Sequence, residues 1–266
     1  MMSNTDAFRD LHAAGTFLIP NPWDAGSARY LQWRGVAAVA TTSSGFASTL
    51  GRSDRAVSLD EVLRHVESIT SAITIPLSVD SERCYADDAS GVARTVGLLA
   101  EAGAAGCSIE DYDPVTRAID GLDAATERVQ AAAEESARHG LVLTARAENN
   151  LYGAGDLDDT IGRLAAYRAV GAEVVYAPGL TDLADISRIV DQVGGAVNVL
   201  AHPNGPSIGE LESVGVRRVS TGGALTWAAY QGLASAVDEL LIESTSAYAT
   251  RSLSGRDRSE IFGPGT

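Results

Sequence analysis

The residues with the clearest capacity for chemistry are two carboxylates that follow a short apolar stretch. Asp80 and Glu82 end the segment 73–79, whose composition is typical of a buried strand. Side chains alternate along a strand, so we expect both carboxylates to point the same way, just past its end. Two acids aimed at one point repel each other unless a cation lies between them, and Mg²⁺ prefers such oxygen ligands. The alternative is that the pair caps the helix that follows.

The composition restricts the classes of partner. The chain has 266 residues, a net charge of −15 and a hydrophobic share of 45%, which fits a soluble globular protein with a substantial core. The negative charge argues against nucleic acid and anionic membrane surfaces as partners. No apolar run reaches the ~20 residues that span a bilayer, and no signal peptide is visible, so we expect a cytoplasmic protein. Two cysteines without a CxxC pair indicate neither a disulfide framework nor a zinc site.

Apolar strand candidates alternate with helical segments along the whole chain. The expected strands are 15–19, 36–41, 73–79, 106–109, 141–145, 172–176, 196–200 and 216–220. The expected helices are 24–33, 58–71, 87–102, 123–139, 156–170, 182–192, a short one from 207, and 223–241, with a loop over 42–57. A helix-ending glycine in a similar local sequence precedes each even-numbered strand. These glycines are Gly35, Gly103, Gly171 and Gly215.

Strict alternation predicts a parallel sheet, and eight strand–helix units close a (β/α)₈ TIM barrel. An open doubly wound sheet is the second interpretation, but it would carry a glycine-rich fingerprint after its first strand, where this chain has Pro20-Asn-Pro22. We therefore expect a single barrel domain over 1–244, with 245–266 as a C-terminal arm or tail.

The chemistry of such barrels lies at the carboxyl ends of the strands. Alternation places Asp80, Glu82, Glu110 and Arg146 on the inside of this rim. Three acids and one arginine in a crowded rim indicate a bound cation, Mg²⁺ or Mn²⁺, with Arg146 left to hold an anionic substrate. The alternative is that Arg146 forms salt bridges with two of the acids and stabilises the barrel.

Further polar residues follow other strands. Ser43-Ser-Gly45 offers hydroxyls and backbone N–H groups that suit an anion, although an ordinary turn has the same sequence. Asp54 is either a site residue or a plain loop acid. His202 is the one histidine at a strand's carboxyl end and is a candidate base. Cys107 points outward from its strand and is expected to be a small core residue. The other rim candidates are Trp23 and Asn198.

Several motifs occur in order and at suitable spacing, and together they resemble the isocitrate lyase/phosphoenolpyruvate mutase superfamily over roughly residues 8–240. The resemblance implies a Mg²⁺-dependent (β/α)₈ barrel that makes or breaks C–C or P–C bonds of α-keto or α-hydroxy acids through a metal-bound enolate-like intermediate. It also implies a homo-oligomer, tetramer or dimer, in which the last helix is swapped between subunits. The motifs are Asn21-Pro-Trp-Asp24, Thr42-Ser-Ser-Gly45, Gly51-Arg-Ser-Asp54, Val79-Asp-Ser-Glu82, Ser108-Ile-Glu-Asp111 and Thr144-Ala-Arg146.

Carried over by position, the resemblance gives each residue a role. Asp80, Glu82 and Glu110 match the metal positions, and Asp54 matches a loop acid near them. Ser44 and Gly45 match the turn that holds the substrate's carboxylate. Arg146 matches the arginine that stabilises the substrate's developing charge.

Three departures from the family pattern limit the reaction. The usual Asp-x-Asp is here Asp80-Ser-Glu82. The lyases' Lys-Lys/Arg-Cys-Gly-His gating segment, which carries their catalytic Cys, is replaced by the short stretch 111–115, without Cys or His. The sixth strand ends in Tyr176-Ala-Pro178, where related enzymes present His or Glu. Isocitrate and methylisocitrate cleavage are therefore not expected.

The sequence predicts a Mg²⁺-dependent C–C bond lyase or decarboxylase acting on a small 2-oxo or 2-hydroxy dicarboxylate, with Tyr112, Asn198 or His202 handling the proton. The first alternative is P–C bond chemistry on phosphonopyruvate, by a mutase or hydrolase. The second is a barrel without catalysis that binds a small acid.

Overall fold

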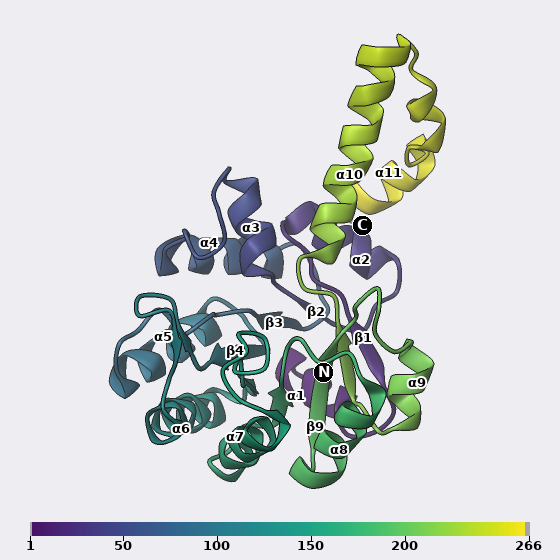
Figure 1. Cartoon of the computed structure of the whole chain (residues 1–266). Coiled ribbons are helices and arrows are strands. Elements are labelled where there is room, and N and C mark those ends of the chain that lie inside the picture. The colour runs from purple at the N-terminus through teal and green to yellow at the C-terminus, as the bar shows by residue number, and fades with distance from the viewer. Residues whose placement is uncertain (1, 264–266) are drawn as a thin grey trace.

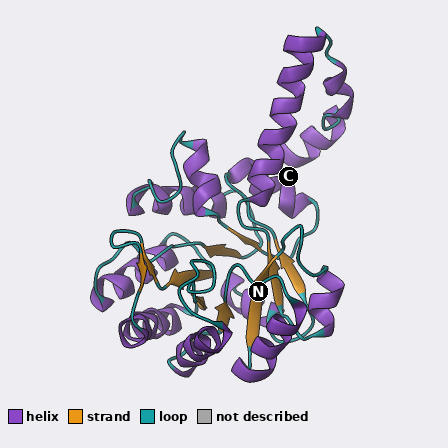
Figure 2. Ribbon diagram, viewed as in Figure 1, coloured by secondary structure: helices purple, strands orange, loops and turns teal. Residues whose placement is uncertain are grey.

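A computed structural model describes residues 2–263 as a barrel of parallel strands enclosed by helices (Figure 1). The strands run in the order β1-β10-β9-β8-β7-β4-β3-β2, all parallel (Figure 2). Ala40 N donates to Pro20 O at 3.1 Å, so the two outer strands meet and the barrel is nearly closed. The (β/α)₈ prediction is confirmed. The strands are β1 (Phe17–Ile19), β2 (Val39–Ala40), β3 (Leu77–Val79), β4 (Gly106–Glu110), β7 (Val142–Arg146), β8 (Val174–Tyr176), β9 (Ala196–Leu200) and β10 (Arg218–Ser220).

Each barrel strand is followed by a helix, and most of these helices begin at a side chain that caps the first turn. Asp88, Asp156 and Asp182 each accept a backbone N–H of the helix that they precede, as N-caps do. The four repeated glycines adopt φ between +84° and +111° and turn the chain from helix to strand. The barrel helices are α2 (Ala25–Trp33), α4 (Leu59–Thr70), α5 (Ala89–Glu101), α6 (Leu122–His139), α7 (Leu157–Ala169), α8 (Leu183–Val193), α9 (Ile208–Ser213) and α10 (Ala224–Asp238).

The lower end of the barrel is filled by an N-terminal helix, α1 (Asn4–Leu11), which the sequence reading did not anticipate. Its Phe8 is fully buried in the small interior cluster. A Cβ added at Gly106 would lie 2.7 Å from the Phe8 ring and 2.6 Å from the Val142 carbonyl oxygen. The glycine therefore makes room for the Phe8 plug, and this end of the barrel is closed.

Two loops contain structure that was not expected. The segment 42–57 holds a helix, α3 (Ser43–Thr49), whose N-cap Thr42 accepts from Gly45 N at 3.3 Å. Its serine- and glycine-rich sequence has low helix propensity, so packing decides its conformation. After β4, a short antiparallel pair, β5 (Tyr112–Asp113) and β6 (Ala118–Ile119), replaces the expected plain loop.

The last segment projects from the barrel along α10 and returns (Figure 1). After α10 come a π-turn (Glu239–Glu243), a 3-10 turn (Ala247–Arg251) and α11 (Gly255–Phe262). Trp33 Nε1 on α2 donates to Glu260 Oε2 on α11 at 3.3 Å, which ties the segment to the barrel. Large apolar side chains stay exposed along α10 and the π-turn: Trp227, Tyr230, Leu233, Val237, Leu240, Leu241 and Ile242. Among residues 2–263, no helix has the length and apolar character needed to cross a bilayer.

Candidate active site

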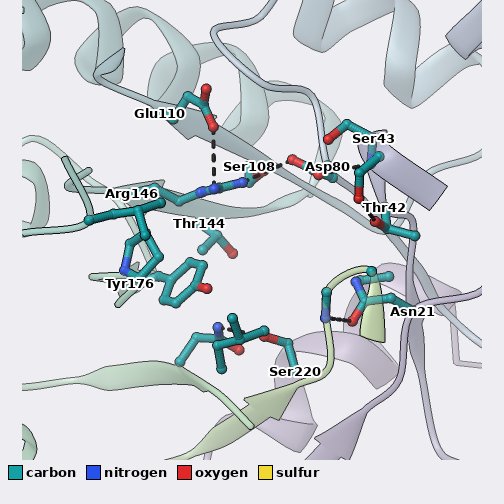
Figure 3. Close-up of a pocket in the computed structure, with 18 of the residues that line it drawn as sticks. Asn21, Thr42, Ser43, Asp80, Ser108, Glu110, Thr144, Arg146, Tyr176 and Ser220 are labelled. Atoms are coloured by element: carbon teal, nitrogen blue, oxygen red, sulfur yellow. Dashed lines mark hydrogen bonds and ion pairs between the residues drawn. The ribbon is translucent and has the colours of Figure 1, made fainter. Parts of the chain in front are cut away.

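A cavity of about 400 Å³ opens where the strands end (Figure 3). Most of the residues predicted from the sequence line it: Ser43, Ser44, Asp54, Asp80, Glu82, Glu110, Arg146, Asn198 and His202. Among the described residues, three predicted ones do not line it: Trp23, Gly45 and Tyr112. The ends of all eight barrel strands, together with the loop that holds Asp54, therefore assemble a polar site.

Arg146 is the centre of the upper part of this cavity, the rim, which lies at the carboxyl ends of the strands. Its Nη1 lies 3.0 Å from Asp80 Oδ1, its Nη2 lies 3.3 Å from Glu110 Oε2, and its Nε lies 2.8 Å from Glu148 Oε1. Figure 3 shows the guanidinium reaching toward Glu110 and Asp80. The structure thus shows the salt bridges to two acids that the sequence left as an alternative, and adds a third partner, Glu148.

Glu110 is held by a second arginine from the loop before α4. Arg55 Nη2 donates to Glu110 Oε1 at 2.7 Å. Burial raises the pKa of the Glu110 carboxyl, although both arginines oppose that shift. The Arg55 guanidinium lies 4.3 Å from the centroid of the Tyr112 ring, which stacks on Tyr152 at 4.0 Å. Tyr112 is therefore packed behind Arg55 and Tyr152, and of these two stacked tyrosines Tyr152 lines the cavity.

Asp80 and Glu82 have different surroundings. Asp80 Oδ2 accepts from Ser43 N at 3.1 Å, which joins β3 to the start of α3. Glu82 accepts from the Tyr85 hydroxyl at 3.1 Å. Burial, and then the nearby Asp80 charge, raise the pKa of Glu82 to about 7. The backbone at Glu82, Cys84 and Tyr85 has φ of +49° to +60°, a left-handed conformation that costs on the order of 1 kcal/mol per residue.

The donor set can be compared with the needs of a divalent cation. Within residues 2–263, no three acid, histidine or cysteine side chains are grouped closely enough to hold a metal ion as they stand. Their chemistry nevertheless suits one, because five carboxylates and three guanidiniums line the described part of the cavity. Burial is the main cause that raises the pKa values of Glu82 and Glu110, and a bound cation would oppose that shift. Hard oxygen donors with surplus negative charge fit Mg²⁺.

The lower part of the cavity, its floor, lies deeper in the barrel and contains another arginine, Arg218 on β10. Its Nε donates to Asn198 Oδ1 at 2.8 Å, and its Nη2 donates to Thr144 Oγ1 at 2.9 Å. Its Nη1 lies 3.4 Å from His12 Nε2. The amide of Asn198 and the hydroxyl of Thr144 carry no charge. His12 is uncharged as well, because burial and then the Arg218 charge lower its pKa to about 3. Within the described part of the chain, Arg218 has no carboxylate partner.

The remaining predicted residues have clear positions. A Cβ at Gly45 would lie 2.5 Å from Thr42 Cγ2 and 2.6 Å from Thr226 Oγ1, so Gly45 is a packing requirement beneath Ser44. The Trp23 Cβ is 3.2 Å from that same point. His202 is exposed at the rim, where its Nδ1 accepts from Asn204 N at 3.2 Å.

Both cysteines are fully buried, and burial raises the pKa of the Cys84 thiol to about 12. Cys107 packs in the core cluster between sheet and helices, as predicted. Neither thiol is among the residues that line the cavity.

Three charged residues of the site received no role from the sequence, although Glu148 is among the polar residues at the end of its strand. Glu148 and Arg218 could have been found by alternation, because they lie two residues from Arg146 and Ser220 and share their inward faces. Arg55 gave no such signal, because it belongs to an irregular loop and its direction depends on a positive φ of 65°.

Comparison with known proteins agrees with this architecture. Residues 8–241 match the family model of phosphoenolpyruvate phosphomutase. A structure from Burkholderia cenocepacia J2315 described as a lyase or mutase is 43% identical, with a TM-score of 0.94, covering 98% of this chain and 96% of that one. An uncharacterised protein of Mycobacterium tuberculosis is 32% identical over 81% of each chain.

Two further proteins have known names. The 2-methylisocitrate lyase of Escherichia coli is 32% identical over 64% of this chain and 60% of its own length. A phosphonopyruvate hydrolase, in complex with oxalate and Mg²⁺, is 19% identical with a TM-score of 0.88, which shows a shared fold. With the family model matched over most of its length, the chain belongs to the isocitrate lyase/phosphoenolpyruvate mutase superfamily of enzymes.

Proposed function

We propose that this protein is a Mg²⁺-dependent lyase or decarboxylase that cleaves a C–C bond of a small 2-oxo or 2-hydroxy dicarboxylate. The observation that carries the proposal is the position of Arg146, a guanidinium held inside the cavity by Asp80, Glu110 and Glu148. Cleavage next to a carbonyl places negative charge on an oxygen. A fixed guanidinium stabilises such charge because its donors are already oriented.

Asp80, Glu82 and Glu110 would hold the metal and its waters. When bound, Mg²⁺ supplies positive charge that stabilises the substrate's oxygen atoms. Occupation of the rim by a cation would also compensate the surplus carboxylates and release Arg146 toward the substrate. Ser44, at the start of α3, would donate its hydroxyl to a substrate carboxylate. These roles follow from the family resemblance, applied to residues that line the cavity.

The proton transfer is assigned by access to the cavity. His202 and Asn198 both line it, and His202 lies at its solvent-facing rim. We propose His202 as the residue that exchanges a proton with the product. Tyr112, which lies behind Arg55 and Tyr152, would have to change its rotamer to take this role.

The exposed apolar face of α10 supports a homo-oligomer. Trp227 on α10 is 54% exposed and Leu241 in the π-turn that follows is 77% exposed, an unusual amount for large apolar side chains that lie in one stretch. We propose that this face is covered by a second copy, in a dimer or tetramer. Light scattering during gel filtration gives the mass directly, and a monomer at micromolar concentration would contradict this proposal.

The reaction is tested by incubating the protein with Mg²⁺, or with EDTA, and with oxaloacetate, substituted malates or phosphonopyruvate. The proposal expects metal-dependent cleavage of at least one of the C–C substrates. Release of inorganic phosphate from phosphonopyruvate alone would establish P–C chemistry instead. Mg²⁺-dependent oxalate binding without turnover of any substrate would establish a binding protein.

A further inference from the structure

The floor of the cavity contains a buried positive charge that has no counter-charge among residues 2–263. The Arg218 side chain belongs to a residue only 5% exposed, and it lines the cavity. A buried ion without an opposite partner is costly in free energy, and proteins usually pair it or bind an ion against it. The neighbouring Arg146 shows the usual solution, with three carboxylates around it.

Arg218 retains hydrogen-bonding capacity that the protein does not use. A guanidinium has five N–H donors, and the contacts to Asn198, Thr144 and His12 use three of them. One N–H remains on each terminal nitrogen. This is the pair of donors that forms a bidentate contact with a carboxylate.

A second observation at the same level of the barrel also indicates a ligand. Ser108 Oγ is buried and has no hydrogen-bond partner among the described residues, and Ser108 lines the cavity. Ser108 is in register with Thr144 on the neighbouring strand, and Thr144 is a partner of Arg218. Ser108 thus lies beside Thr144 in the sheet, and the Arg218 guanidinium reaches that same Thr144 from β10.

The depth of this place separates it from the upper site. Thr144 lies two residues before Arg146 on β7 with its side chain on the same face, a rise of about 7 Å along the strand. Small interior residues such as Ser78 and Ala40 leave this level of the barrel open. The cavity therefore has a cation at each of two levels, and only the upper one is neutralised by the described residues.

We propose that Arg218, with Ser108 and Thr144, forms a second anion site that receives the distal carboxylate of the substrate. This inference rests on the proposed function for its choice of ligand. It makes the substrate a short dicarboxylate that enters with one carboxylate at the rim and the other at the floor. Arg218 is then a residue that determines specificity for two acidic groups over one.

The test is a calorimetric titration, in low-chloride buffer containing Mg²⁺, with malonate as the dicarboxylate and acetate as the monocarboxylate. The wild type should bind malonate at least about 30-fold more tightly than acetate. Arg218→Met should reduce that preference to about 3-fold or less. The matched control is Arg217→Met, which removes an arginine that points away from the cavity and donates to Gly15 O; both affinities should be unchanged.

A preference for malonate that survives in Arg218→Met would overturn the inference. Chloride or phosphate that protects the wild type against heat without competing with malonate would show a structural anion only, and would overturn it as well. If Arg218→Met does not fold, Arg218→Lys, which keeps the charge and loses the fork, should show an intermediate loss of preference. A preference in Arg218→Lys equal to that of the wild type would contradict the inference.

The two proposals fail separately. If a dicarboxylate is cleaved and its KM is the same in wild type and Arg218→Met, the floor site is wrong and the proposed function stands. If the malonate preference depends on Arg218 but no acid is cleaved with Mg²⁺, the floor site stands and the proposed reaction is wrong.

Discussion

Arg146 and Arg218 lie in the same cavity but in opposite electrostatic surroundings. Asp80, Glu110 and Glu148 surround the upper guanidinium, whereas the partners of the lower one in the described part of the chain are an amide, a hydroxyl and a neutral imidazole. The rim has a surplus of negative charge and the floor has uncompensated positive charge. A metal ion suits the rim and a carboxylate suits the floor, so the difference indicates how a metal and a diacid would divide the cavity.

The largest effect on stability and turnover is expected from Arg146→Met, which removes the paired guanidinium of the rim. Removal of the guanidinium leaves Asp80 and Glu148 without this cation and Glu110 with Arg55 alone, which should lower the free energy of unfolding by about 3–5 kcal/mol. Turnover should fall about 10²–10³-fold, because the developing oxyanion loses a fixed donor. Urea unfolding and steady-state kinetics measure the two effects, and Arg217→Met is the control. Unchanged stability would show that the rim carboxylates do not need Arg146.

The rim itself is tested by comparing its two neighbouring acids. Asp80→Asn should weaken Mg²⁺ binding at least about 100-fold, whereas Glu82→Gln should weaken it about 10-fold, as expected for a residue that acts through bound water. Fluorescence or calorimetric titration with Mg²⁺ gives both values. Equal losses would mean that Glu82 is a direct ligand, and no loss in Asp80→Asn would remove the metal from this place.

The closed end beneath the floor is tested by Gly106→Ala. The new methyl group would collide with the Phe8 ring and a carbonyl oxygen, and should destabilise the protein by about 1–3 kcal/mol. Gly162→Ala in α7 is the matched control, because it meets no neighbouring atom and should stabilise by up to about 1 kcal/mol. Thermal unfolding of both variants decides; a neutral Gly106→Ala would mean that Phe8 does not seal the barrel.

The smallest effect is a pH dependence at the floor. Burial, and then the Arg218 charge, lower the pKa of His12 from 6.5 in the unfolded chain to about 3. The unfolded chain therefore binds the proton first, so this contribution to stability is present above about pH 6.5 and is lost as the pH falls toward 3. His12→Gln should lose less stability than the wild type over that range. If the stabilities of the two proteins change with pH in the same way, His12 is not held uncharged in the folded protein.

The regular part of the molecule was predictable from sequence. The eight strands and their helices followed from alternation and caps, since Asp88 and Asp156 mark helix starts by their chemistry alone. The rim acids and Arg146 followed from strand alternation. These features depend on local patterns of a few residues.

What the sequence did not yield depends on tertiary packing. Helix α3 forms from poor helix-forming residues, and α1 has a single fully buried anchor, Phe8. Salt bridges between Arg146 and two of the acids could be predicted but not distinguished from a metal site, because both arrangements use the same residues. The uncompensated charge of Arg218 was invisible, because it depends on what does not lie next to it.

A structure of the protein with Mg²⁺ and malonate would test the central claim most directly. We expect the metal among Asp80, Glu82 and Glu110. We expect one carboxylate of malonate beside Arg146 and its other carboxylate on Arg218. Malonate bound with both carboxylates at the rim, or metal density away from these three acids, would contradict it.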